Sequence, residues 1–155
     1  MPLPSTNVTP TAAQVGYGAA FSVGTGLPGA YVYTQIAEVK DIKPSGFTVG
    51  EEDVTTLGSP SATREFVPTL VEGGTVEISG NYIADTTQTQ LETLAKARTI
   101  FPFQFAFPLS TSKNVTRSGL CFITKLAPGA DIVADKAPAF NCTMRITGVE
   151  TEVIA

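Results

Sequence analysis

GEEDVTTLGSPSATREFVPTLVEGG, residues 50–74, is a segment too long for a hairpin turn and too regularly patterned for a disordered linker. It is dense in charge, yet it keeps apolar or β-branched residues at intervals, including Val54, Leu57, Phe66 and Leu70. A compact domain seldom carries so long a connection unless the connection is functional or disordered. Disordered segments are poor in aromatic and β-branched residues. We therefore interpret residues 50–74 as a long assembly loop between strands that contacts another subunit.

The residues after this loop alternate as a half-buried β-strand does. In residues 75–82, Val76 and Ile78 fall on one face, whereas Glu77, Ser79 and Asn81 fall on the other. The same period gives residues 101–107 and residues 140–146 one apolar face each. The side chains on these two faces are Phe101, Phe103, Phe105 and Phe107, and Phe140, Cys142, Met144 and Ile146. We expect the phenylalanine stripe to be the centre of the core; the lining of a hydrophobic ligand pocket is the alternative.

One segment has the spacing of an α-helix. Leu91 and Leu94 recur at the interval of an amphipathic helix, and Asp85 and Gln88 match a looser form of the capping box, with Asp85 as N-cap. The apolar stripe of this segment is narrow. We therefore expect a single helix that lies against a sheet and caps one end of the core.

The beginning of the chain differs in composition from the rest. Residues 1–35 contain no charged side chain, and residues 1–30 are interrupted repeatedly by proline and glycine, which break regular structure. At 155 residues the chain is expected to form one domain. We therefore predict an extended N-terminal arm over residues 1–30 and a single β-domain over residues 31–155.

The residue types present exclude several kinds of chemistry. The chain has no histidine, so it lacks the commonest general base and the commonest metal ligand, and no Ser-His-Asp or Cys-His site is possible. We expect no catalytic residue, no cofactor and no metal ion. Glu51, Glu52 and Asp53 form the densest acidic cluster, but their spacing matches no calcium loop, and we interpret them as charges that face solvent or a partner. Cys121 and Cys142 lie in strand-like segments, and we expect free buried thiols rather than a disulfide.

The overall charge also limits the partners. The formal net charge is −4 and no cluster of Lys and Arg is visible, which argues against a nucleic-acid-binding surface. No apolar run approaches the length of a membrane span, and the N-terminus lacks the pattern of a secretory signal. Only 15% of the residues are charged, compared with about 25% in typical globular chains. We therefore expect other subunits to cover much of the surface.

The order of the short motifs resembles a known family. DVTTLGSP at residues 53–60, REFVPTL at residues 64–70 and the glycine pair at residues 73–74 lie between the strand-like segments IAEVKDI, residues 36–42, and residues 75–82. In this order and spacing they are similar to the major tail tube protein of long, non-contractile-tailed phages. The resemblance covers roughly residues 31–110.

This resemblance implies a mainly β fold, a β-sandwich or partial barrel with one flanking α-helix, whose copies close into hexameric rings. The rings stack into a tail tube through which phage DNA passes without specific binding. A tape measure protein and a tail terminator are the implied partners, and the virion tail, assembled in the host bacterial cytoplasm, is the implied location. The residues that the motifs assign to contacts between subunits and rings are Asp53, Thr55, Thr56, Arg64, Glu65, Phe66 and Pro68.

The polar strand face has its own expected place in such a tube. We expect Glu77, Ser79 and Asn81 to face the lumen, because a hydrophilic and acidic wall repels the phosphates of DNA. The nearest alternative function is the inner tube of a contractile tail or secretion system, which shares the ring architecture. A monomeric immunoglobulin-like binding or adhesin module is a more distant alternative, and an enzyme that uses a carboxylate pair is the least favoured.

Overall fold

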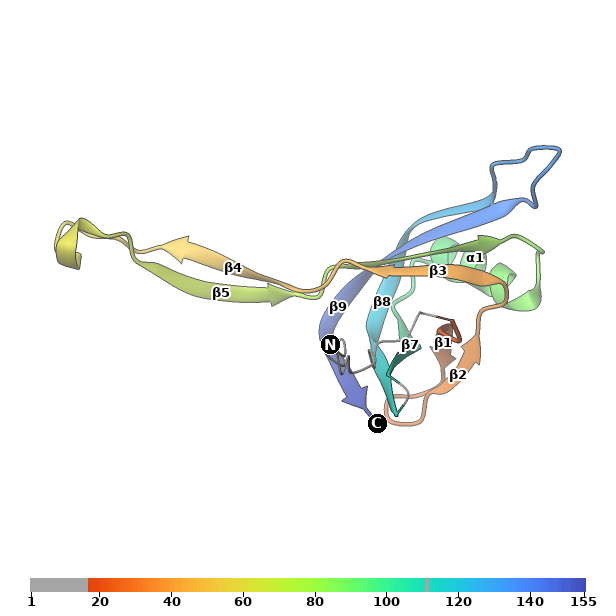
Figure 1. Cartoon of the computed structure of the whole chain (residues 1–155), viewed down its shortest axis with the longest axis horizontal. Helices are drawn as coiled ribbons and strands as arrows, with labels where there is room; N and C mark the ends of the chain where they lie inside the picture. Colours follow the sequence, from red (N-terminus) through yellow and green to blue (C-terminus); the bar gives the residue numbers. More distant parts are fainter. Residues whose placement is uncertain (1–16, 111) are drawn as a thin grey trace, which may run out of the picture.

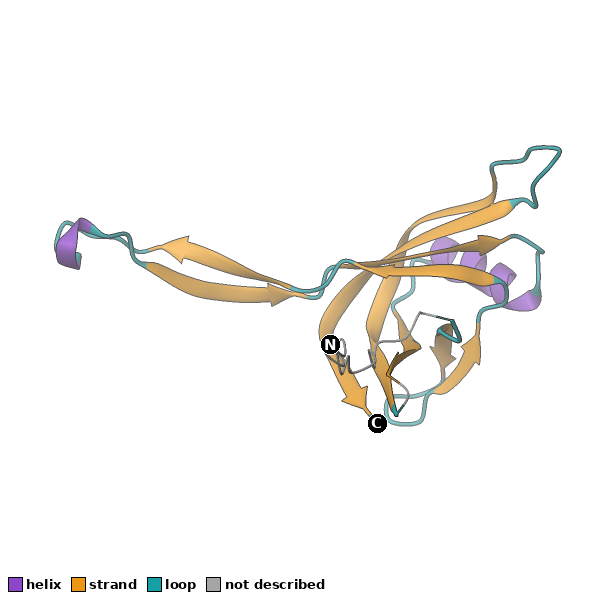
Figure 2. Ribbon diagram, in the orientation of Figure 1, coloured by secondary structure: helices purple, strands orange, loops and turns teal. Residues whose placement is uncertain are grey.

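The computed structural model describes residues 17–110 and 112–155 as an antiparallel β-fold with one α-helix and a projecting hairpin (Figures 1 and 2). A seven-stranded sheet has the order β2-β1-β7-β8-β9-β6-β3, and β4 pairs with β5 alone. The elements are β1 (Ala20–Thr25), β2 (Val32–Gln35), β3 (Val39–Pro44), β4 (Thr48–Asp53), a 3-10 turn (Pro60–Ala62), β5 (Phe66–Glu72), β6 (Thr75–Asn81), α1 (Thr86–Ala97), β7 (Phe101–Ser110), β8 (Lys113–Ala130) and β9 (Ala139–Ile154). A mainly β fold with one flanking helix is thereby confirmed.

The phenylalanine stripe of β7 lies in the core, as its spacing predicts. Phe101, Phe103 and Phe105 are at most 3% exposed. Phe21 of β1 stacks on Phe103, with ring centroids 6.1 Å apart, and on Phe105 at 6.4 Å. The alternating face of β9 is buried on the same cluster together with Val76 and Ile78 of β6. Each fully buried phenylalanine contributes about 1.5–3 kcal/mol of burial free energy, so burial of this face is a major source of the stability of the fold.

Helix α1 covers one end of this core. Asp85 is the N-cap, and its carboxylate accepts hydrogen bonds from the backbone N–H and the hydroxyl of Thr87. Leu91 is fully buried. Gln88 does not complete a capping box, contrary to the sequence prediction. It is buried instead, accepting a hydrogen bond from the N–H of Ile83 and donating to the carbonyls of Ala37 and Asn81, so that it joins the helix to the sheet.

The predicted N-terminal arm is corrected in its second half. Residues 20–25 form β1, which pairs with both β2 and β7, and Phe21 and Val23 are fully buried in the core. The aromatic and β-branched residues of this strand outweigh the surrounding glycines, because β7 offers them a partner that the sequence alone does not reveal. Residues 1–16 of the predicted arm lie outside the described residues.

Residues 50–74 are not a loop, contrary to the sequence prediction. Residues 50–72 belong to a hairpin arm, defined here as residues 48–72, in which β4 follows β3 and β5 leads through Gly73 and Gly74 into β6. The arm extends far from the sheet along the long axis of the molecule (Figure 1). Gly46 and Gly74 stand where the arm leaves the sheet, and both adopt positive φ, at +82° and +78°. The two glycines allow both strands of the hairpin to change direction at the point where the arm leaves the sheet.

Candidate assembly surfaces

The hairpin arm exposes apolar side chains along its whole length. Every residue of β4 and β5 is exposed. Phe66 is 50% exposed, Leu70 83%, and Leu57 at the tip is entirely open to solvent. An isolated two-stranded hairpin is at best marginally stable in water, and apolar patches of this kind mark contacts with other proteins. The arm therefore has the character of a binding element.

The arm also carries the charge of the protein. It holds five of the fourteen acidic residues and one of the ten basic residues, so it accounts for the whole formal net charge of −4. Directly opposite residues of a hairpin share a face. Asp53 lies opposite Phe66 and Glu51 lies opposite Pro68, whereas Glu52 lies opposite Val67 on the other face. Each face of the arm thus presents an apolar strand beside an acidic one.

The predicted polar contact residues organise the tip of the arm. The N–H and the hydroxyl of Thr55 both donate to the carboxylate of Asp53, and the N–H of Glu65 donates to the Thr55 hydroxyl oxygen at 2.9 Å. These bonds lower the pKa of Asp53, the hydroxyl contributing more than the N–H. Arg64 lies 3.9 Å from the Asp53 carboxylate and is 77% exposed, so its guanidinium stays open to solvent. The structure therefore brings together four of the seven predicted residues.

A second set of hydrogen bonds closes the turn of the tip. The hydroxyl of Ser59 donates to the carboxylate of Glu65 at 2.6 Å and accepts from the N–H of Thr56 at 2.9 Å. The hydroxyl of Thr63 donates to the Pro60 carbonyl at 2.6 Å. Ser59 was not predicted from the sequence, because its role depends on a register between residues that are 6 positions apart. These contacts assign Thr56 and Glu65 a structural role within the arm.

Pro68 has a particular position in the arm. The N–H of Val54 donates to the carbonyl of Glu65 at 2.9 Å, which fixes the alternation of the β4–β5 ladder. Because antiparallel partners alternate between bonded and non-bonded pairs, Pro68 opposite Glu51 falls in a non-bonded pair. Its ring nitrogen therefore points to the free edge of β5, where the missing N–H discourages the addition of another strand.

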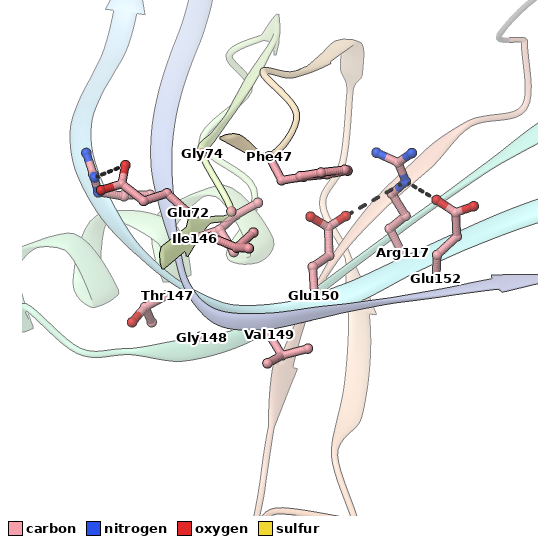
Figure 3. Close-up of a pocket in the computed structure, with 13 residues that line it drawn as sticks. Phe47, Glu72, Gly74, Arg117, Ile146, Thr147, Gly148, Val149, Glu150 and Glu152 are labelled. Carbon is pink, nitrogen blue, oxygen red and sulfur yellow. Dashed lines mark hydrogen bonds and ion pairs between the residues drawn. The ribbon is translucent and has the colours of Figure 1, made fainter. Parts of the chain in front are cut away.

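A groove lies at the root of the arm, along the second half of β9 (Figure 3). It has a volume of about 750 Å³. Arg117 reaches the carboxylates of Glu152 at 2.8 Å and Glu150 at 3.8 Å. Burial raises the pKa of Glu150, although the charge of Arg117 opposes this shift. Phe47 extends over this ion-paired cluster and is 73% exposed.

The groove is bounded at its other side by a second ion pair. Arg145 of β9 lies 3.3 Å from Glu72, the last residue of β5, and ties the root of the arm to the sheet. The groove was not predicted from the sequence. Glu150 and Glu152 do alternate at strand spacing, but their pairing with Arg117, which is 35 positions from Glu152, appears only when β8 and β9 are aligned.

The outer face of the sheet, opposite the core, carries the predicted luminal residues. Glu77 is exposed and Ser79 and Asn81 are half-buried, while their neighbours along β6 are buried. Lys43 of β3 lies opposite Glu77, and Lys125 of β8 lines the same shallow depression. The face is polar, as expected. It carries charges of both signs, because Ser79 donates to the carboxylate of Asp41 and Asn81 donates to that of Glu38, while the two lysines flank Glu77.

Other features predicted from composition can also be placed. Cys121 and Cys142 are buried and free. No helix among the described residues is long and apolar enough to cross a membrane. Within residues 17–110 and 112–155, no three carboxylate or thiol groups gather in a cluster that would hold a metal ion.

Comparisons with known proteins find solved structures with a similar fold. No family model and no curated protein matches the sequence. The tail of an empty gene transfer agent particle, refined with C6 symmetry, matches with a TM-score of 0.67 at 18% identity and covers 90% of this chain and 98% of that chain. The SPP1 tail tube matches with a TM-score of 0.60 at 12% identity, covering 86% of this chain and 75% of that chain. The tube-terminating cap of the anti-feeding prophage matches with a TM-score of 0.68 at 10% identity, covering 100% of both chains. The resemblance inferred from the motifs is confirmed at the level of the fold: the chain has the fold of the tail tube proteins of phages and related particles.

Proposed function

We propose that this protein is a non-enzymatic structural subunit of a virion tail that assembles itself into stacked hexameric rings, forming the tube through which the genome leaves. The observation that carries the proposal is the hairpin arm, a folded element that exposes apolar side chains on both faces and, beyond its root, packs on none of the other residues that the structure describes. Such an element lowers its free energy only when another molecule covers it. Another copy of the chain is the partner that a tube supplies.

The composition of the arm indicates how the contact is made. Phe66 is the one aromatic residue of β5, and half of its side chain is exposed. Aromatic residues that enter a pocket contribute most of the binding energy at protein interfaces. The acidic residues of β4 beside it favour a partner surface that carries Lys or Arg and thereby set the register of the contact. Arg64, exposed at the tip, adds a cation for a carboxylate of the neighbour.

We assign the outer face of the sheet to the wall of the tube lumen. Glu77, Ser79 and Asn81 project from a face without a large apolar side chain between them. Because Lys43 and Lys125 stand beside Glu77, this face carries charges of both signs. Such a luminal wall neither binds DNA phosphates tightly nor repels them strongly. A tape measure protein inside the tube and a terminator at its end complete the proposed set of partners.

Electron microscopy of the purified, concentrated protein tests this function. We expect rings or tubes of uniform diameter from the wild-type chain, and a wild-type chain that stays monomeric at every concentration contradicts the proposal. Phe66→Ala is expected to give a folded monomer that assembles poorly. Ile100→Ala is the matched control, because Ile100 is 57% exposed but lies outside the arm, and it should assemble as the wild type does. A Phe66→Ala variant that assembles as readily as the wild type would show that Phe66 does not anchor the contact.

The inner tube of a contractile particle is the second candidate. It is favoured by the match to the anti-feeding prophage cap over the full length of both chains and by a match to a sheath-tube complex of an extracellular contractile injection system, with a TM-score of 0.59. The two candidates share the tube and differ in what surrounds it. Particles isolated with a contractile sheath around the tube would favour the second candidate, and bare tubes the first.

A further inference from the structure

The second half of β9 has a free backbone edge. Asn114 and Ala155 exchange two backbone hydrogen bonds, of 2.7 and 3.0 Å, which fixes the alternation of the β8–β9 ladder. Counting from this pair, Glu152 and Ile154 fall in non-bonded pairs with β8. Their N–H and C=O groups therefore point away from β8. On that side, β6 pairs with β9 only as far as Arg145, so no other strand of residues 17–110 and 112–155 lies beside the backbone of Glu152 and Ile154, and Glu152 lines the groove.

Two other edges of the fold are closed by proline. Pro68 closes the outer edge of β5, as described above. On β3, the N–H of Ser45 donates to the Thr75 carbonyl at 2.8 Å, so the adjacent Pro44 turns its nitrogen away from β6 to the free edge. Proline at an outward position cannot donate to an added strand. The edge of β9 has no such block, since none of its residues is proline.

Of the end strands of the two sheets that the structure describes, β4 and β2 remain with a free edge and no proline. On β4 the outward groups belong to Glu51 and Asp53, which would stand beside Glu150 and Glu152 of β9, and like charges directly opposite each other are destabilising. β2, of sequence VYTQ, carries no charge.

The outward groups of β2 follow from its own ladder. The N–H of Ile36 donates to the Phe21 carbonyl at 2.9 Å, and the register then directs the backbone of Tyr33 and Gln35 to the free edge. Among the end strands of the described sheets, β2 is therefore the one whose edge and charge fit the edge of β9.

We propose that β2 of a second copy adds to the free edge of β9 and continues the sheet from one subunit into the next. The inference rests on the proposed function, because it names the surfaces that close the ring. The two edges lie on opposite flanks of the body (Figure 1). A contact between different surfaces of identical subunits is heterologous, and it propagates into a ring or a filament. Strand addition of this kind gains affinity from backbone hydrogen bonds, whereas side chains beside the edge give specificity.

The apolar side chains that line the groove also favour β2 of a second copy as the strand that binds there. A strand added to β9 lies at the root of the arm, between Phe47 and the exposed Val149, and brings Val32, itself 66% exposed, to these apolar groups. A subunit seated there also lies beneath the arm, which leaves the body on the same flank (Figure 1). One neighbour would therefore cover both the groove and the exposed side chains of the arm.

A proline at the edge of β9 tests this pairing without disturbing the fold. Ile154→Pro removes an N–H that points away from β8 and leaves the internal ladder intact. Ile154→Ala is the matched control, because it removes the same side chain but keeps the N–H. We expect Ile154→Pro to raise the protein concentration needed for ring formation by about tenfold or more, which corresponds to about 1.4 kcal/mol per contact. Ile154→Ala should assemble at nearly the wild-type concentration.

Mixing two variants tests whether β2 is the partner. Gln35→Pro blocks the edge of β2 and keeps that of β9, whereas Ile154→Pro does the reverse. At the lowest protein concentration at which the wild type forms rings, each variant alone should remain monomeric in analytical ultracentrifugation, and an equimolar mixture should form heterodimers that cannot grow. Circular dichroism of each variant, matching that of the wild type, would show that the fold is retained.

The outcomes separate this inference from the proposed function. If the wild type and Ile154→Pro form rings equally well, the β2–β9 pairing is wrong and the tube function stands. If the mixture stays monomeric although the wild type forms rings, β2 is not the strand that β9 receives. A cryo-electron microscopy map of the ring with another segment at the β9 edge would also overturn the pairing. If the wild type forms no rings, it is the proposed function that fails.

Discussion

The carbonyl oxygen of Gly46 occupies the space that a β-carbon at Gly74 would need. The two glycines face each other where the hairpin arm leaves the sheet, and the hydroxyl of Ser45 fills the rest of that space. The Ser45 hydroxyl oxygen also accepts a hydrogen bond from the N–H of Thr75, so the root is held by side chain and backbone together. The direction of the arm therefore depends on the absence of a side chain at one position.

Gly74→Ala should be the most damaging single substitution at the root. Alanine at a left-handed backbone position costs about 1–3 kcal/mol, and the overlap with Gly46 adds about 1–3 kcal/mol of overpacking. Gly46→Ala is the matched control, because Gly46 has a similar φ but no atom within 4 Å of its added β-carbon. Urea denaturation should give a larger loss for Gly74→Ala than for Gly46→Ala, and equal losses would contradict the steric argument.

How far the sequence predicts this structure depends on the range of the interactions. The alternation of apolar and polar residues predicted the buried faces of β6, β7 and β9, because this pattern is local to each strand and all three faces pack into the same core. The strand that contains Phe21 could not be predicted in this way, because it lies among glycines. Its place in the sheet becomes apparent only from its pairing with residues 103–106 of β7.

The candidate site shows the same limit. The motifs of residues 53–70 identified the arm, but they could not distinguish a loop from a hairpin, because β4 and β5 bury no face that would impose an alternation. The groove and the free edge of β9 arise where β6 departs from β9 after Arg145, which is a property of strand lengths in space. Such a property leaves no local signal in the sequence.

Gln88 should contribute more to stability than any other polar side chain of α1. Gln88→Ala leaves the N–H of Ile83 and the carbonyls of Ala37 and Asn81 without their partner. Because a buried group without a hydrogen bond costs about 1–3 kcal/mol, we expect a loss of about 2–4 kcal/mol in urea denaturation. Gln90→Ala, two positions along the same helix, is the control and should change the stability by less than about 0.5 kcal/mol. A similar small loss for Gln88→Ala would show that water replaces its contacts.

The tip of the arm should loosen in acid. The pKa of Asp53 is lowered by hydrogen bonds from Thr55, so the folded tip favours the ionised carboxylate. Its stabilisation is present above the ordinary carboxyl pKa of about 3.9 and is lost as the pH falls through the lower pKa of the folded tip. Amide hydrogen exchange at Thr55 and Glu65, corrected for the intrinsic effect of pH, should therefore lose protection in that range. Asp53→Asn removes the titrating group, and an equal acid response in this variant would assign the effect to another residue.

The two cysteines should make the protein sensitive to alkali and resistant to thiol reagents. Burial raises the pKa of Cys142 to about 12 and raises that of Cys121 at least as strongly, with a smaller contribution from the neighbouring Cys142. The fold therefore favours the neutral thiols, and their stabilisation is complete below the unfolded pKa of about 8.5. Between about pH 8.5 and 10 each thiol should lower the free energy of unfolding by about 1.4 kcal/mol per pH unit. A Cys121→Ala/Cys142→Ala variant, although less stable, should show a flatter profile over that interval. Iodoacetamide should label neither thiol in the native protein, and it should label both thiols in urea without reductant. If neither cysteine is labelled in urea, the two cysteines form a disulfide.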